Sequence, residues 1–279
     1  MGHRQGVDQP RSKGGRPYGA TLSKTDYAII DQIAREGFQT YSELREGPLK
    51  GRDRSYSWQL MKRLVRLGVI QECNSGGGGR GILGWSIPRK TIPKLKASGN
   101  PEWSELHTGP SYRTSFQHDL ILRRIKKLLT ASQLITDWVP EHVLKSDAVS
   151  RFQYIAPRNR YEKLFLVPDA IVHLGPPERR SNAALELELT RKSRRRIYKK
   201  LEAYVTSKDF DYAFFILGSE PLLSVFQEIY RDVRDTSITA KLETDPNEIY
   251  FTTLANIQSC GLTARFLGAH DTLSLADLS

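Results

Sequence analysis

The chain has few cysteines and no long apolar run. Cys73 and Cys260 are the only two cysteines among 279 residues, too few for a disulfide framework or a cysteine-based zinc site. No apolar stretch is long enough to cross a bilayer, and residues 1–20 lack the apolar core of a signal peptide. These absences argue against a disulfide-stabilised secreted scaffold. They predict a reduced, cytoplasmic, soluble protein with no membrane partner.

Acidic residues are in the minority. The chain has 31 Asp and Glu against 42 Lys and Arg, which gives a formal net charge of +11 and a pI near 9.6. A balance this basic predicts a polyanionic partner. Nucleic acid is the first candidate, and an anionic membrane surface is the second.

The length of the chain suits two modest domains. Residues 1–20 are polar, basic and rich in Gly and Pro, so we expect a disordered basic tail. Residues 89–111 also have prolines and little apolar periodicity, which is typical of a linker. The expected domains therefore span residues 21–88 and 112–279.

Residues 21–88 have the pattern of three helices followed by a hairpin. Capping residues precede a first helix that ends at Gly37, and a short second helix is expected over residues 41–44. A third helix is expected over residues 55–67, and two strands (69–72 and 82–87) flank a glycine-rich tip. This order predicts a winged helix-turn-helix, in which the third helix enters the major groove of DNA.

Basic and polar residues gather on and before the expected third helix and at the hairpin tip. As contacts to double-stranded DNA we expect Arg52, Arg54, Ser57, Lys62, Arg63, Arg66 and Arg80. A solvated basic face or a protein-docking module would show a similar pattern. The glycine run lacks the Gly-Lys-Ser/Thr ending of a phosphate-binding P-loop, so a wing is favoured.

The second domain alternates helices and strands. Helices are expected over residues 115–129, 194–205 and 222–233. Strands are expected over residues 135–143, 165–173, 183–190 and 212–217, with a last one over 248–253. This order predicts a mixed α/β (α+β) domain.

Carboxylates stand on two neighbouring expected strands. Asp169 follows Pro168 on one strand, and Glu186 and Glu188 alternate with leucines on the next. Strand periodicity places the two glutamates on one face, roughly 7 Å apart, with Asp169 roughly 5 Å away on the neighbouring strand. Three oxygen ligands at such spacing would suit Mg²⁺. The alternative is that both glutamates form the polar face of an amphipathic strand.

The order of elements, with Pro-Asp on one strand and Glu-x-Glu on the next, resembles the restriction-endonuclease-like PD-(D/E)xK superfamily. The resemblance implies an αβββαβ core in which Asp169 and Glu186 hold a metal ion. Glu188 stands where the superfamily has a lysine that helps to position the attacking water. Glu188 could be a third metal ligand or a general base. The missing cation could come from Lys192, Lys199 or Arg191, and His118 could act as a base or a ligand.

A narrower resemblance extends over residues 22–226. Besides the expected winged helix, the chain has His118 at a helix start, Pro168-Asp169-Ala170, the strand ending in Glu186-Leu187-Glu188-Leu189-Thr190, and Lys200-Leu201-Glu202-Ala203-Tyr204. These motifs resemble the replication-relaxation proteins of plasmids and mobile elements. The resemblance implies a role in processing such DNA, with a second copy of the chain or other mobile-element proteins as partners.

The densest basic cluster directly follows the carboxylate strand. We expect it to contact the DNA backbone through Arg191, Lys192, Arg194, Arg195 and Arg196. Pairing with the carboxylates is the competing role.

Two functions remain open: a DNA-binding protein with a degenerate nuclease-like domain, which we favour, and an active Mg²⁺-dependent endonuclease or nickase. A protein-docking module is a third reading, which the positive charge disfavours.

Overall fold

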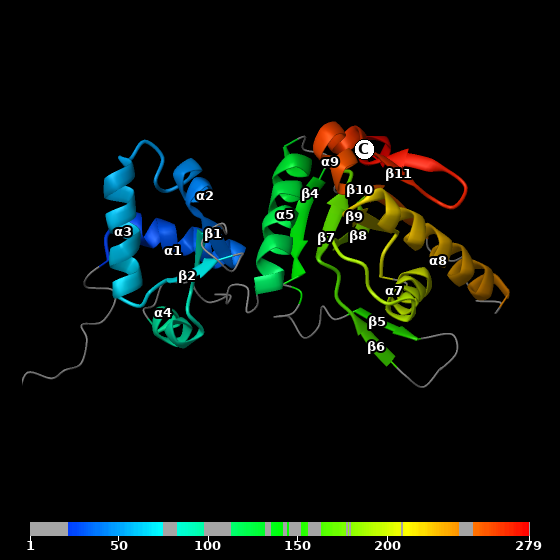
Figure 1. Cartoon of the computed structure of the whole chain (residues 1–279), viewed down its shortest axis with the longest axis horizontal. Helices are drawn as coiled ribbons and strands as arrows, with labels where there is room; N and C mark the ends of the chain where they lie inside the picture. Colours follow the sequence, from blue (N-terminus) through cyan, green and yellow to red (C-terminus); the bar gives the residue numbers. More distant parts are fainter. Residues whose placement is uncertain are drawn as a thin grey trace, which may run out of the picture. The chain divides into compact units, whose positions relative to one another are not determined.

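The computed structural model divides the chain into two compact units, Met1–Phe116 and Gln117–Ser279. It describes residues 22–74, 83–97, 113–131, 135–141, 144, 152–155, 163–176, 178, 180–207, 209–239 and 248–278. The architecture is mixed α/β, and the largest sheet contains both parallel and antiparallel strands (Figure 1). The expected mixed class is therefore confirmed.

The first unit packs helices on a small antiparallel sheet. Its elements run in the order α1 (Lys24–Glu36), β1 (Phe38–Thr40), α2 (Tyr41–Glu46), α3 (Arg54–Arg66), β2 (Gln71–Asn74) and β3 (Leu83–Ser86). The strand order in the sheet is β1-β3-β2. Strand β1 was not expected from the sequence, because three residues are too few to show a period.

Side-chain caps set where these helices begin. Ser23 and Asp26, which lie in the stretch where capping residues were expected, form a reciprocal capping box at α1. Thr40 and Glu43 do the same at α2, and the carboxylate of Asp53 accepts the first free N–H groups of α3. Each cap satisfies backbone donors that the helix itself leaves unpaired.

Part of the range expected to be a linker is helical. Arg89–Thr91 forms a short 3₁₀ helix that continues into α4 (Ile92–Lys96). Leu95 is fully buried in the core of the first unit, and Thr91 Oγ1 donates a hydrogen bond to the Gly68 carbonyl. Pro93 stands in the first turn of α4, where its missing N–H does no harm. The tail (1–20) and residues 98–111 lie outside the described residues.

The second unit is built on a sheet of seven strands with the order β12-β11-β10-β9-β8-β7-β4. In chain order its elements are α5 (Arg113–Thr130, which crosses the boundary between the units), β4 (Ile135–Pro140), β7 (Ala170–Leu174), β8 (Ser181–Glu188), α7 (Arg194–Thr206), β9 (Tyr212–Leu217), α8 (Glu220–Thr239), β10 (Ile249–Thr253), α9 (Leu254–Cys260), β11 (Arg265–Leu267) and β12 (Thr272–Ser274). Strands β5 (Phe152–Ile155) and β6 (Lys163–Leu166) form a separate hairpin.

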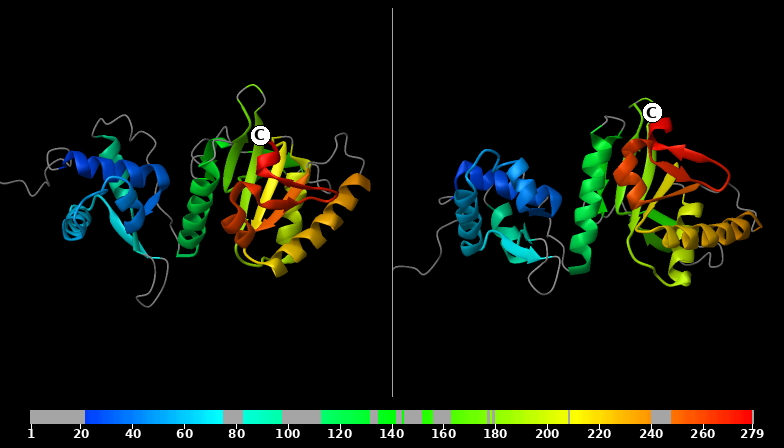
Figure 2. Two further views of the ribbon diagram at one scale, coloured as in Figure 1. Left: turned by 90° about the horizontal axis from the view of Figure 1, so that it is seen from above. Right: turned by 45° about the horizontal axis from the view of Figure 1, so that its top comes forward.

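Helices cover both faces of this sheet (Figure 2). One apolar cluster joins α7 and α8 to alternate strand residues such as Ala184 and Phe215. The other joins α5 and α9 to the opposite residues, including Leu185 and Leu187. Strand β9 is buried on both faces, as its apolar sequence predicted. The carboxylates of β8 therefore face a layer of helices.

The strand expected over residues 165–173 is not continuous. Residues Lys163–Leu166 pair with β5, and β7 begins only at Ala170. Pro168 lies in the break, where it has no N–H to donate to a neighbouring strand. The interruption places Asp169 at the entrance of β7, next to the end of β8.

Candidate functional site

Three carboxylates converge where β7 begins and β8 ends. Asp169 directly precedes β7, and the register that pairs Ala170 with Leu185 brings it beside the last residues of β8. Asp169 Oδ2 accepts a hydrogen bond from the backbone N–H of Leu187 at 2.8 Å. Glu186 and Glu188 lie on the face of β8 opposite Leu187 and are 1% and 2% exposed. The three residues are therefore brought together, as predicted, in a largely buried setting.

Lys200 on α7 bridges the two glutamates. Its Nζ lies 2.6 Å from Glu186 Oε2 and 2.8 Å from Glu188 Oε1. A second cation, Lys192, donates to Glu188 at 2.7 Å. Burial acts to lower the pKa of Lys200, but Glu186, Glu188 and Asp169 outweigh it and raise that pKa above its usual value. Lys200 is therefore a fixed positive charge among three acids.

The other oxygen of Glu186 is also occupied. The buried hydroxyl of Tyr204, one turn after Lys200, donates a hydrogen bond to Glu186 Oε1. Burial raises the pKa of Glu186 to about 8, with Asp169 adding to the rise and Lys200 opposing it. Burial, together with the charge of Glu186, also raises the pKa of Tyr204 well above its usual value. Tyr204 therefore stays protonated and keeps donating.

His118 on α5 closes the other side of the cluster. Its Nε2 lies 3.2 Å from Asp169 Oδ2 and 3.0 Å from the Leu187 carbonyl, and its Nδ1 lies 3.2 Å from Asp119. Burial acts to lower the pKa of His118, but its bonds to Asp119 and Asp169 raise it to about 10. Burial would raise the pKa of Asp169, yet His118 and Lys200 hold it near 2. The pair is therefore a half-buried ion pair at neutral pH.

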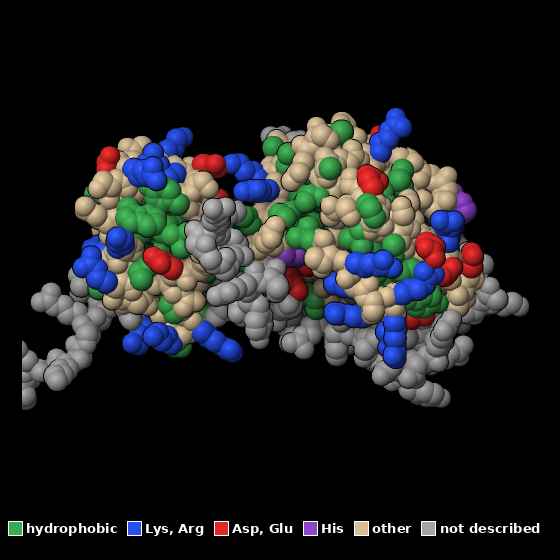
Figure 3. Space-filling view, in the orientation of Figure 1, with side chains coloured by type: hydrophobic (Ala, Val, Ile, Leu, Met, Phe, Trp, Pro, Cys, Tyr) green, Lys and Arg blue, Asp and Glu red, His purple; other side chains and the backbone are tan. Residues whose placement is uncertain are grey.

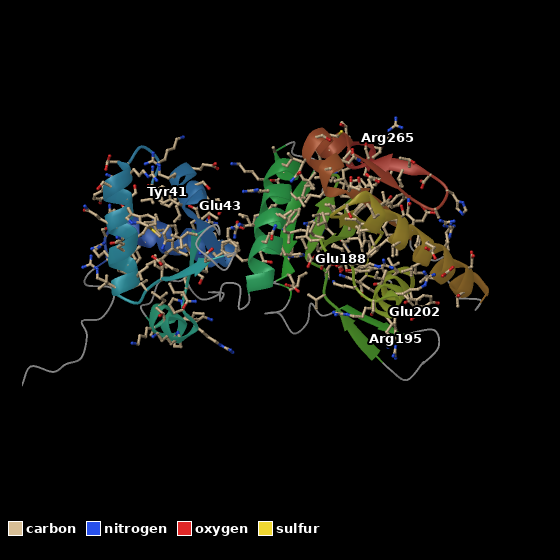
Figure 4. All side chains as sticks on the ribbon, viewed as in Figure 1. Tyr41, Glu43, Glu188, Arg195, Glu202 and Arg265 are labelled. Carbon is tan, nitrogen blue, oxygen red and sulfur yellow. The ribbon has the colours of Figure 1, made fainter. Side chains whose placement is uncertain are left out.

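The basic segment after β8 divides into three groups. Lys192 turns inward to Glu188, as the sequence allowed. Arg194 pairs with Glu228 and Asp232 of α8 instead of standing free for DNA. The remaining side chains are exposed, and Figure 4 shows Arg195 on the outer side of α7 and Glu188 within the unit. These exposed residues are Arg191, Arg195, Arg196 and Lys199.

Sequence reasoning missed Lys200 and Tyr204 as members of this cluster. It proposed Lys192, Lys199 or Arg191 as the substitute cation, yet Lys199 and Arg191 point outward. Helical spacing carries the missing signal. Lys200 follows the buried Ile197 by three residues and precedes Tyr204 by four, so it lies on the inner face of α7.

The donor set does not fit a Mg²⁺ ion as it is arranged. Both oxygens of Glu186 already accept hydrogen bonds, and Glu188 is held by two ammonium groups. Among the described residues, no group of three or more His, Cys, Asp or Glu side chains is disposed to hold a metal ion. Both oxygens of Glu186 and both oxygens of Glu188 are therefore occupied by Lys192, Lys200 and Tyr204 of the chain itself.

A second candidate site is the exposed face of α3. Successive turns place Ser55, Tyr56, Gln59, Lys62 and Arg66 on one exposed stripe, which we name the α3 face. Arg52, which precedes the helix, adds its charge 5.9 Å above the ring of Tyr56. The helix contains no Asp or Glu. Figure 3 shows Lys and Arg side chains over this helix.

The expected DNA contacts of the first unit do not all lie on this face. Ser57 is fully buried, and its hydroxyl bonds the Asp53 carbonyl, so this prediction was wrong. Arg63 forms an ion pair with the buried Asp26, which ties it to α1. Arg54 is exposed and lines a cavity of about 710 Å³ together with Tyr41 and Trp58. Arg80 lies outside the described residues.

In the described part of the chain, no helix combines the length and apolarity needed to cross a membrane. Comparison of the chain with family models, with curated proteins and with solved structures found no match.

Proposed function

We propose that this chain is a double-stranded DNA-binding protein whose first unit is a winged helix-turn-helix. The α3 face carries the proposal, because it presents two basic side chains, a tyrosine and two other uncharged polar residues, with Arg52 adjoining it, and α3 contains no acid. The element order α1-β1-α2-α3-β2-β3 supports it as well. In such units the third helix meets base edges, while basic side chains position the phosphates.

The second unit, in this proposal, is a nuclease-like domain that no longer cuts. Its support is the closed carboxylate cluster, in which Lys200, Lys192, Tyr204 and His118 occupy the acids that would hold a metal ion. The exposed arginines on and before α7 give this unit its own surface for phosphates. A role in plasmid or mobile-element replication or mobilisation is supported by the motif resemblance alone.

The test is a fluorescence-anisotropy titration of labelled duplex DNA at several salt concentrations. Wild-type protein should bind, with an affinity that falls steeply as salt rises. Lys62→Gln with Arg66→Gln should weaken binding at least tenfold, whereas Asp169→Ala in a folded protein should leave it unchanged. Arg35→Gln, an exposed change at the far end of α1, is the matched control. Absence of duplex binding at low salt would end the proposal.

An active Mg²⁺-dependent endonuclease or nickase is the second candidate. The observation that favours it is the position of Lys200 beside Asp169 and Glu186. Lys200 supplies the positive charge that is missing at Glu188, where the superfamily has a lysine. Activity would require Lys200 and Tyr204 to release Glu186. Mg²⁺- or Mn²⁺-dependent nicking of supercoiled plasmid that Asp169→Ala abolishes would favour this candidate, and an intact plasmid would remove it.

A further inference from the structure

The segment that follows the small sheet of the first unit is a second basic surface. Arg89, Lys90 and Lys96 are exposed on the 3₁₀ helix and α4, and we name these three residues the basic extension. Residues 83–97 contain no Asp or Glu. The positive charge of this segment is therefore not offset along its own length.

The basic extension is fixed to the core of the unit. Leu95 is fully buried, and Ile92 packs against the same apolar cluster that holds α1 and α3. Leu95 and Ile92 face inward, whereas the three basic residues precede or follow them in the chain and are exposed. The cations are therefore carried on a rigid support.

The extension also adjoins the end of α3. Thr91 is buried, and its hydroxyl donates to the carbonyl of Gly68 at 2.8 Å. Gly68 directly follows the C-cap residue of α3, two positions after Arg66. The bond therefore places Lys90 and Arg89 next to the C-terminal end of the α3 face. Figure 3 shows Lys and Arg side chains both over α3 and beside α4.

We propose that the basic extension binds phosphates of the DNA backbone flanking the segment contacted by α3. The α3 face and the basic extension meet at the turn that follows α3. A polyanion that continues past the end of α3 would therefore contact the cations of both. A contact from the basic extension to phosphates carries no information about the bases, so it adds affinity that is independent of DNA sequence. The inference rests on the proposed DNA binding and extends the contact surface by one element.

The test is the salt dependence of duplex binding by single variants. The slope of log K against log salt is negative, and each lost phosphate contact should make it less steep by roughly 0.9. We expect this decrease, with a several-fold loss of affinity, for Arg89→Gln, Lys90→Gln and Lys96→Gln. Arg35→Gln is the matched control, because Arg35 lies nine residues along α1 from the Asp26–Arg63 contact. Circular dichroism should show unchanged folding in all four variants.

The outcomes distinguish a failure of this inference from a failure of the proposed DNA binding. One outcome is that wild-type protein binds duplex and Lys62→Gln weakens that binding, while the three extension variants keep the wild-type salt slope. In that case the basic extension does not touch DNA and the inference is wrong. If wild-type protein does not bind duplex at low salt, both ideas fail together. If the salt slope of Arg35→Gln becomes less steep by the same amount, the effect comes from the overall charge of the protein, and the inference is also overturned.

Discussion

Lys200 Nζ lies 2.6 Å from Oε2 of the buried Glu186. Glu186 is 2% exposed at its side chain and Lys200 is 24% exposed. Removing Lys200 would leave Glu186 and Glu188 buried without the cation that lies between them. The stability of the second unit should therefore depend on this contact.

Lys200→Met should lower the free energy of unfolding by about 3–5 kcal/mol, measured by urea denaturation. Lys199→Met is the matched control, because Lys199 is exposed on the same helix; its effect should stay within about 0.5 kcal/mol. Adding Glu186→Gln to Lys200→Met should recover part of the loss. Equal effects of the Lys200 and Lys199 substitutions would contradict the structural role of the pair.

Tyr204 supports the same carboxylate from the other oxygen. Tyr204→Phe keeps the ring in its apolar site but leaves a buried acceptor short of one donor. We expect a loss of about 1–3 kcal/mol in unfolding free energy. Tyr56→Phe should have no measurable effect on stability, since Tyr56 is 46% exposed. If Tyr204→Phe leaves the free energy of unfolding unchanged, the hydroxyl of Tyr204 does not stabilise Glu186.

His118 should make stability depend on alkaline pH. Its pKa rises from 6.5 to about 10 in the folded protein, because Asp119 and Asp169 outweigh the opposing effect of burial. A raised folded pKa gives a contribution that is complete below about 6.5 and is lost as pH rises through about 10. The stability difference between wild type and His118→Gln should therefore shrink over this range. A difference that stays constant from pH 6 to 10.5 would refute the His118–Asp169 ion pair.

Arg63 and Lys62 are neighbours on α3 with different expected roles. Arg63→Met should destabilise the first unit by about 1–3 kcal/mol, because it removes a donor from the buried Asp26. Lys62→Met should leave stability unchanged and weaken duplex binding, since Lys62 is exposed on the α3 face. Thermal melts and anisotropy titrations on both variants would check this separation. The reverse pattern would mean that the α3 face is assigned to the wrong side of the helix.

Much of the fold follows from local signals in the sequence. Capping residues such as Ser23 located the start of α1, and the alternation of Leu185 and Leu187 with glutamates located the faces of β8. The strand break at Pro168 was missed, because an apolar run appeared to continue across it. Short elements such as β1, β11 and β12 have too few residues to show a period, and only pairing with neighbours defines them.

The site was harder to predict than the fold. Asp169, Glu186 and Glu188 could be grouped from strand order, but burial of their carboxylates depends on α7 packing over them. Ser57 resembles its polar neighbours in sequence, yet the rotation of α3 buries it. The inward turn of Lys200 was readable from its spacing to Tyr204, whereas the ion pair of Arg63 with Asp26 joins residues 37 positions apart.

The most direct test of DNA binding without cleavage is one plasmid assay. Supercoiled plasmid is incubated with protein and Mg²⁺ at low salt, and each sample is run on agarose with and without detergent. We expect retarded plasmid without detergent and unchanged supercoiled plasmid with it. Open-circular or linear product in the detergent lane that disappears with Asp169→Ala, or no retardation in the other lane, would contradict it.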